Sequence, residues 1–248
     1  IKEGVKEKKF DPPLIREFDG IRVAVTGVTL TPLTTEIAYE LDLPDRYDRL
    51  QYNSRREIPI GEIVTHRDLE FQLWDGKGLM LEPLGGSSHG NRHIARFASI
   101  SLDNHELILR AAERQSKMKN QGNGSFIGTE KPVVQYYELP DDFPFSVSQG
   151  EAGEITFRSM TFEDGQTWAE YEVQGSEPYV QDNAWWVEDD QGREYRFEYY
   201  DQTRLQDDAY VYKAKLPALP RKSKLKIAVI EIKPLKRIDE LELVVPLD

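Results

Sequence analysis

The sequence predicts an all-β protein with two tandem immunoglobulin-like domains, each an antiparallel β-sandwich. Short stretches of alternating apolar and polar residues recur between turn-forming residues, as expected for strands. One strand–turn–strand pattern occurs twice, at residues 25–41 and 157–173, and in both copies the alternation loses its phase at the same point. A repeat with a shared irregularity indicates two domains of one kind.

The two copies are VTGVTLTPLTTEIAYEL and FRSMTFEDGQTWAEYEV, and they are related by a shift of 132 residues. Four residues are identical, and in the first copy these are Thr29, Thr35, Tyr39 and Glu40. Each copy has a turn signal in the same place, Pro32 in the first and Asp164-Gly165 in the second. The pattern therefore predicts two equivalent hairpins.

The loss of phase falls at Gly27 in the first copy and at Ser159 in the second. The apolar residues before and after it are Val23, Val25, Val28 and Leu30 in one copy and Ile155, Phe157, Met160 and Phe162 in the other. A shift of one residue moves a strand's side chains to the opposite face of the sheet. The sequence thus predicts either a β-bulge or a strand that passes from one sheet to the other.

Two further pairs of segments correspond. Hairpins are predicted around Asp75-Gly76-Lys77-Gly78 and around Asp189-Asp190-Gln191-Gly192. The third pair is HELILRAAER, residues 105–114, and SKLKIAVIEI, residues 223–232. We expect a strand over 106–112, although the composition of residues 106–119 also suits a helix.

The repeat sets the expected domain boundaries. Residues 1–13 are predicted to be an extended N-terminal segment that belongs to whatever precedes it. The first domain is expected over 14–147, with long loops at 43–68 and 114–131, and the second over 151–248. The polar, glycine-containing segment VSQGEAG at 147–153 is the predicted linker.

Composition excludes several classes of protein. The net charge of −12 disfavours nucleic acid as a partner, because phosphate binding requires clustered Lys and Arg. The absence of cysteine excludes disulfides, thiolate metal sites and cysteine nucleophiles. The sequence has neither a signal peptide nor an apolar run of the ~18–20 residues that span a bilayer. Any membrane attachment is therefore expected through an upstream segment.

No catalytic, cofactor-binding or metal-ligating residue is predicted. The string GGSSHGNRH, residues 85–93, contains Ser and His but lacks Gly-x-Ser-x-Gly, so a polar loop is expected. A metal site at His89 and His93, with His66 or His105 as a third ligand, is a weaker alternative, because Gly90 disfavours a helix there. The acidic pairs at 141–142, 189–190 and 207–208 leave calcium open but lack EF-hand spacing.

Aromatic and apolar residues in two regions are candidates for a binding surface. Trp185, Trp186 and Tyr179 belong to the densest aromatic group. Because neighbouring strand residues face opposite sides, we expect one tryptophan in the core and the other exposed or at the domain junction. Phe126 and Ile127 lie in the polar segment 116–132, which is either a recognition loop or merely mobile.

The strings GVTLTPLTTEIAYEL and SMTFEDGQTWAEYEV resemble the extracellular region of a Gram-positive membrane-protein family linked to extracytoplasmic-function sigma factors. That family has a short cytoplasmic anti-sigma-like segment, one transmembrane helix and immunoglobulin-like domains of unknown function outside the cell. The lack of cysteine fits it. The resemblance rests on a strand–turn–strand pattern, so it implies a location and an architecture but transfers no functional residue.

From this resemblance we expect a non-enzymatic extracellular module of a membrane-anchored anti-sigma-type regulator. It would act as a spacer, a sensor or a protein-binding ectodomain at the cell surface. One alternative is a carbohydrate-binding or adhesive module of a cell-wall protein, which would use Trp185 or Trp186 and nearby tyrosines. Another is a hydrolase that uses loops 43–68 and 85–93.

Overall fold

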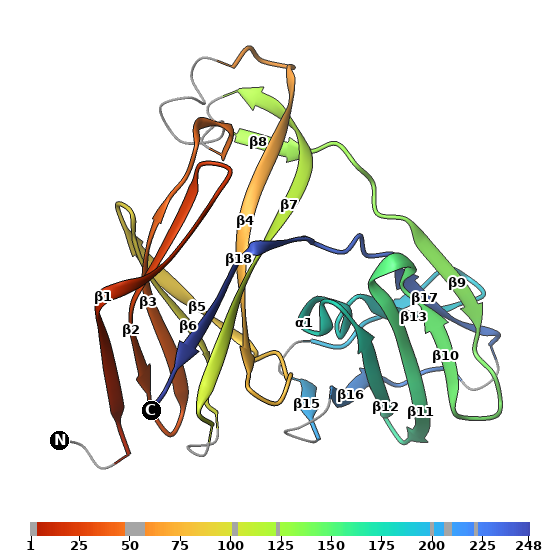
Figure 1. The fold of residues 1–248 in the computed structure, drawn as a ribbon. Coiled ribbons are helices and arrows are strands. Elements are labelled where there is room, and N and C mark those ends of the chain that lie inside the picture. The colour runs from red at the N-terminus through yellow and green to blue at the C-terminus, as the bar shows by residue number, and fades with distance from the viewer. Residues whose placement is uncertain are drawn as a thin grey trace. The chain divides into compact units, whose positions relative to one another are not determined.

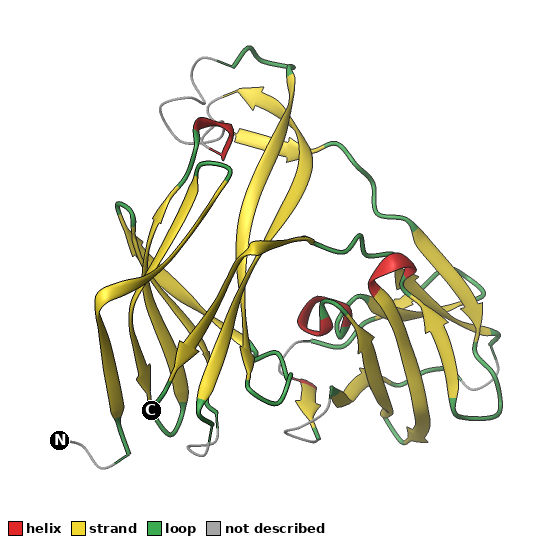
Figure 2. Cartoon of the chain, viewed as in Figure 1, coloured by secondary structure: helices red, strands yellow, loops and turns green. Residues whose placement is uncertain are grey.

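The computed structural model describes residues 4–47, 58–100, 104–122, 125–198, 201–205, 210–220 and 223–248. Its regular structure is almost entirely antiparallel β-strand, as the sequence predicts, and the helices are single short turns (Figures 1 and 2). The chain divides into two compact units. Unit 1 comprises residues 1–130 and 236–248, and unit 2 comprises residues 131–235.

Unit 1 contains two antiparallel sheets. The five-stranded sheet has the order β1-β2-β3-β6-β5, and the other has the order β18-β7-β4 with β8 paired to β7. The strands are β1 (Lys6–Phe18), β2 (Ile21–Leu30), β3 (Thr34–Asp42), β4 (Ile63–Asp75), β5 (Pro83–His89), β6 (Arg92–Ala98), β7 (Glu106–Gly122), β8 (Ser125–Gly128) and β18 (Lys236–Pro246). A short 3-10 helix, η1 (Asp45–Tyr47), follows β3.

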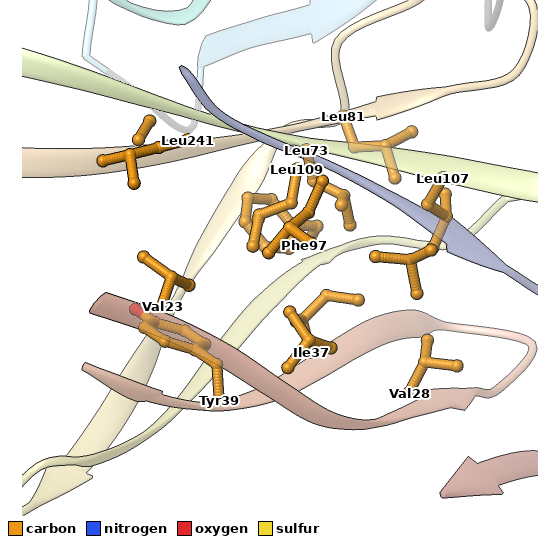
Figure 3. Packing of buried hydrophobic residues seen from close by; sticks show 14 of the residues in the cluster. Val23, Val28, Ile37, Tyr39, Leu73, Leu81, Phe97, Leu107, Leu109 and Leu241 are labelled. Atoms are coloured by element: carbon orange, nitrogen blue, oxygen red, sulfur yellow. The ribbon is translucent and has the colours of Figure 1, made fainter. Parts of the chain in front are cut away.

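The core of unit 1 lies between these two sheets. Val23 of β2 and Ile37 of β3 point towards Leu73, Leu109 and Leu241 of the opposite sheet (Figure 3). In β3 the residues Thr35, Ile37 and Tyr39 are buried and alternate with partly exposed ones, as expected for a strand with one face on the core. Burial of one such aliphatic side chain stabilises the folded state by about 1.5–3 kcal/mol, which makes this layer the main stabilising feature of the unit.

Unit 2 repeats this construction. Its sheets have the orders β10-β11-β12-β16-β15 and β14-β13-β17-β9. The elements are β9 (Val134–Glu138), β10 (Phe145–Ser148), η3 (Gly150–Ala152), β11 (Gly153–Glu163), β12 (Gln166–Gly175), α1 (Pro178–Gln181), β13 (Trp185–Asp189), β14 (Glu194–Tyr195), β15 (Gln202–Arg204), β16 (Val211–Pro217) and β17 (Leu225–Ile230). Its core is more aromatic: the Trp185 ring lies 4.8 Å from that of Phe157 and 5.1 Å from that of Tyr171.

The predicted irregularity is a β-bulge in both units. The register of β2 against β3 shifts between Val25 and Gly27, so Thr26 is the extra residue. The register of β11 against β12 shifts between Phe157 and Ser159, where Arg158 is extra. Both strands stay within one sheet along their whole length, so the bulge, rather than a change of sheet, explains the loss of phase.

The second predicted pair of hairpin turns also has matching geometry. The Asp75 carboxylate accepts hydrogen bonds from the backbone N–H groups of Lys77 and Leu79, at 2.9 and 2.8 Å. The Asp189 carboxylate accepts from those of Gln191 and Arg193, at 3.0 and 2.9 Å. An aspartate that caps its own turn in this way fixes the hairpin in both units.

The third pair corresponds to β7 and β17, each of which pairs with the strand that carries this turn. Residues 106–119 therefore form a strand and not a helix, because their alternating side chains pack on the core of unit 1. Much of the expected loop 114–131 belongs to β7 and β8, and β4 already begins at Ile63. The expected long loops are thus shorter than the sequence suggests.

The boundaries of the units differ from those expected from the sequence. Residues 6–13 are not a separate segment, because they belong to β1, which pairs with β2. The last strand, β18, pairs with β7 and completes unit 1, whereas residues 134–138 form β9 and pair with β17 in unit 2. Unit 2 is therefore inserted in the sequence of unit 1. Edge strands pair over long sequence separations, which a local repeat does not show.

Candidate functional site

Unit 2 has a cleft of about 810 Å³ at one end of its sandwich. It lies where β9 ends, where β17 begins and beside the second half of β11. The residues that line it are Glu138, Leu139, Pro140, Asp141, Phe143, Met160, Thr161, Phe162, Ser223, Lys224, Leu225 and Lys226. Its volume is in the range of known ligand sites.

The floor of this cleft is apolar and its rim is charged. Met160 belongs to the core of unit 2, and Phe143 and Leu225 are partly buried against that core. Two acids, Glu138 and Asp141, and two bases, Lys224 and Lys226, stand around the opening. This combination is typical of a site that takes apolar side chains and orients them with polar groups.

One wall of the cleft is a strand edge. β12 pairs with β11 from Gly153 to Glu163, but β10 covers the opposite side of β11 only from Glu154 to Phe157. Among the described residues, no strand pairs with Ser159–Thr161 on that side. Alternate residues of a strand direct their N–H and C=O groups to each side, so this stretch presents backbone hydrogen-bonding groups at the cleft. We call residues 159–161 the open edge.

Unit 1 has a second, smaller and more polar pocket of about 380 Å³. Its central group is the carboxylate of Glu113, which is buried. It accepts a hydrogen bond of 2.6 Å from the Tyr47 hydroxyl and one of 3.0 Å from the Arg67 guanidinium, and Gln115 is a third donor. Asp19 and Arg46 form an ion pair at 2.7 Å on the rim.

The Glu113 carboxylate of this pocket is charged and fully hydrogen-bonded by its neighbours. Burial alone raises the pKa of Glu113, but the hydrogen bonds from Tyr47, Gln115 and Arg67 outweigh it, and the net shift is downwards. Burial, and then the neighbouring Glu113, raise the pKa of Tyr47 to about 12. A carboxylate with a lowered pKa is a poor general acid and a weak base at neutral pH. The pocket therefore has the character of a structural polar cluster.

The tryptophans considered as a binding surface are both buried. Trp185 is 1% exposed within the core, and Trp186, on the other face of the sheet, is 4% exposed. The Arg196 guanidinium covers the Trp186 ring at 3.9 Å from its centroid. Tyr179 is half-buried, and its hydroxyl accepts a hydrogen bond of 2.8 Å from Arg204. These residues do not form an exposed aromatic strip.

Phe126 and Ile127 lie in β8, where they pair with Asn120 and Lys119 of β7. Ile127 is 54% exposed, and Phe126 is half-buried. The two residues are thus part of the sheet in unit 1 and are in a different unit from the tryptophans. The five candidate residues are therefore divided between the two units.

The enzyme-like string GGSSHGNRH forms the hairpin between β5 and β6. Ser88 faces His93 across this hairpin, and the His93 ring stacks on Tyr39 at 5.2 Å. Of the other histidines, His66 pairs with Asp68 and His105 with Asp248. In the part of the chain that the structure describes, no three His, Asp or Glu residues lie close enough together to hold a metal ion. The acidic pair 207–208 lies outside the described residues.

The comparisons with known proteins identify no family. No protein-family profile matches the chain, and no curated protein matches it. A solved structure, a conserved domain protein from Bacillus anthracis, is 11% identical over 98% of this chain and 92% of that chain, with a TM-score of 0.27. That score is too low to define a shared fold. None of the described helices is long and apolar enough to cross a bilayer.

Neither the cleft nor its open edge was predicted from the sequence. A signal was present, because the shift of 132 residues that relates the two hairpins also places Pro12 on Pro144. Extended in this direction, the repeat aligns residues 6–9, which cover β2, with residues 138–141, which line the cleft. The comparison of these two segments locates the site.

Proposed function

We propose that this chain is a non-enzymatic, protein-binding extracellular module of a membrane-anchored anti-sigma-type regulator, and that the cleft of unit 2 is its binding site. The observation that carries the binding role is the open edge beside a cleft of about 810 Å³ whose floor is apolar. Backbone groups at a strand edge bind extended polypeptide, and an adjacent cleft selects its side chains. The extracellular and regulatory parts of the proposal rest on the resemblance of the repeated hairpin.

A protein partner is favoured over a carbohydrate by the burial of Trp185 and Trp186. Sugar rings stack on exposed aromatic faces, and these two indoles present none. A hydrolase is disfavoured by the lowered pKa of Glu113 and by the hairpin geometry of residues 85–93. Neither feature supplies an activated nucleophile or a general acid.

The binding role is tested by selecting displayed random peptides on the immobilised chain. We expect enriched peptides whose affinity falls at least tenfold in the Phe143→Arg variant, because this change places a charge in the apolar floor. Leu84→Arg is the matched control, since it adds the same charge to an exposed residue of unit 1. Peptides that bind both variants as tightly as the parent chain would show that the cleft is not the site.

Two further measurements address the other parts of the proposal. A glycan array separates the carbohydrate alternative, and saturable binding to one glycan class, with no peptide enriched, would favour it. The parent reading frame addresses the anchor, for which we expect an apolar stretch of ~20 residues upstream of Ile1. A parent sequence without such a stretch would contradict the membrane-anchored role.

A further inference from the structure

The two units cover equivalent strand edges differently, and the difference identifies the kind of ligand that the cleft takes. In unit 1 the first residues of β1 pair antiparallel with the part of β2 that follows the bulge. The partners are Lys9 with Gly27, Lys8 with Val28 and Glu7 with Thr29. The repeat places Ser159, Met160 and Thr161 at these positions of β11. The open edge is thus the equivalent of an edge that holds a strand in unit 1.

The path of the chain explains why unit 2 leaves this edge uncovered. In unit 1, β18 occupies the edge of β7, and β1 runs along the whole of β2. In unit 2 the residues before β10 form β9, which pairs with β17 in the other sheet. The segment that would extend β10 along β11 therefore belongs to the other sheet, and residues 139–143 connect β9 to β10 beside the cleft.

The side chains around the open edge define what an added strand must carry. Directly opposite residues of an antiparallel pair share a face of the sheet. Met160 is 9% exposed and belongs to the core, so the residue opposite it points into the cleft. Thr161 is exposed, so the residue opposite it faces solvent. The neighbouring Phe143 and Leu225 make an apolar side chain the best occupant of the inward position.

We propose that residues 159–161 accept an extended strand of a partner protein, antiparallel to β11, with an apolar side chain seated beside Met160. The added strand takes the place that residues 6–9 take on β2. It carries apolar residues at alternate positions, and its outward residues are polar. This inference rests on the proposed function and specifies how the partner is held.

The test traps the register of a bound peptide by disulfide formation. The chain has no cysteine, so Thr161→Cys introduces a single thiol on the exposed face of the open edge. Peptides selected on the parent chain are resynthesised with one cysteine at each position in turn. Directly opposite residues bring their Cβ atoms within about 4.5–5.5 Å, near the range for a disulfide. We expect cross-linking at one peptide position, weaker cross-linking two residues away and none at the intervening residues.

Thr29→Cys is the matched control, because Thr29 occupies the equivalent position of β2 and is already paired with Glu7. It should give less than one tenth of the cross-linking yield. A second readout replaces alternate backbone N–H groups of the peptide by N-methyl groups. Strand addition predicts at least a tenfold loss of affinity for one alternate set of positions and little change for the other.

The outcomes separate this inference from the proposed function. Peptides that depend on Phe143 but show neither a preferred register nor an alternating response to N-methylation would overturn strand addition while leaving the binding role intact. Disulfide-linked dimers of the Thr161→Cys chain without peptide would identify a second copy as the occupant and overturn the partner assignment. Failure to select any peptide that depends on Phe143 would overturn both.

Discussion

Units 1 and 2 share a bulged hairpin but differ in how their sheets end. Thr26 and Arg158 bulge at equivalent positions, and the buried Thr35 and Thr167 follow at equivalent places. Outside this hairpin, unit 1 takes its last strand from the C-terminus, whereas unit 2 takes β9 from the segment that precedes it. The inner strands of the sandwich are thus determined locally, while the edge strands depend on which segment reaches them.

The largest expected effect comes from removing β18. A chain that ends at Leu235 loses the buried residues Leu241, Leu243, Val245 and Leu247. At about 1.5–3 kcal/mol for each, the loss is roughly 6–12 kcal/mol, which is comparable with the whole stability of a domain. We expect unit 1 to unfold and unit 2 to remain folded. Hydrogen exchange measured by mass spectrometry should show loss of protection in β2 and β3 and retention in β11 and β12.

The reciprocal fragment, residues 131–235, sharpens the same comparison. It contains both sheets and the complete core of unit 2, including β9. We therefore expect it to unfold cooperatively on its own in urea, with a dispersed amide spectrum before the transition. A fragment without cooperative unfolding would mean that unit 2 depends on unit 1 and that the division into two self-sufficient units is wrong.

The equivalent tyrosines of the two hairpins should differ in what their hydroxyl groups contribute. The Tyr171 hydroxyl is buried, donates to the Asp182 carbonyl at 2.7 Å and accepts from Gln202 at 2.6 Å. Among the described residues, no hydrogen bond is recorded for the Tyr39 hydroxyl. Tyr171→Phe removes both of these hydrogen bonds, each worth about 0.5–1.5 kcal/mol, so it should lower the free energy of unfolding by about 1–3 kcal/mol.

Tyr39→Phe is the control, and it should change the free energy of unfolding by less than about 0.5 kcal/mol. Both values come from urea titrations of the single variants. Equal effects at the two positions would show that the aromatic rings, rather than the Tyr171 hydroxyl network, make the difference between the two cores.

Acidification should affect unit 1 through Glu113. The pKa of this carboxylate in the folded state lies below its ordinary value of 4.5, so its charged form stabilises the fold. This contribution is complete above about pH 4.5 and is lost as the pH falls through the lower pKa of the folded state. Glu113→Gln should flatten that part of the stability profile and destabilise unit 1 at pH 7 by about 1–3 kcal/mol. A profile unchanged by the substitution would contradict this role.

The features that the sequence predicted are those formed by residues close to one another in the sequence. The bulges follow from the phase of Val25 and Val28, and the aspartate turn at 189–192 from its own residues. The strand at 106–122 was more difficult to predict, because its composition also suits a helix. Packing of its side chains in the sandwich overrides that local preference. In each case a local pattern held the information, since bulges and two-residue turns involve contacts over a few positions.

The features that the sequence did not predict depend on competition between distant segments. Both β18 and β9 are alternating strands, and nothing within residues 236–246 shows that they pair with β7. The burial of Trp186 depends similarly on Arg196, which lies just after β14. The open edge of the cleft has the same origin. β9 pairs with β17, so the segment before β10 does not pair with residues 159–161 of β11. A site formed by the absence of a strand leaves no motif of its own.

The smallest expected effect concerns the residue that follows the extra residue of each bulge, which is Gly27 in unit 1 and Ser159 in unit 2. A Cβ atom built on Gly27 would lie 3.1 Å from the Lys8 carbonyl oxygen, so glycine permits β1 to approach β2 closely. The equivalent residue, Ser159, carries a Cβ atom where no described strand approaches. Gly27→Ser should therefore cost up to about 1 kcal/mol and speed hydrogen exchange in residues 6–9, because only this segment must move.

The reciprocal change, Ser159→Gly, tests whether the open edge is built to receive a strand. Removal of the Cβ atom should allow an added strand to approach as closely as Lys8 approaches Gly27. We expect the affinity of a cleft-bound peptide to rise by about twofold to fivefold, a gain of up to roughly 1 kcal/mol, as measured by isothermal titration calorimetry. The free energy of unfolding should fall by no more than about 1 kcal/mol, the usual cost of glycine in a strand. A weaker affinity for the same peptide would show that the ligand contacts the Ser159 side chain and does not pair with the backbone as residues 6–9 do.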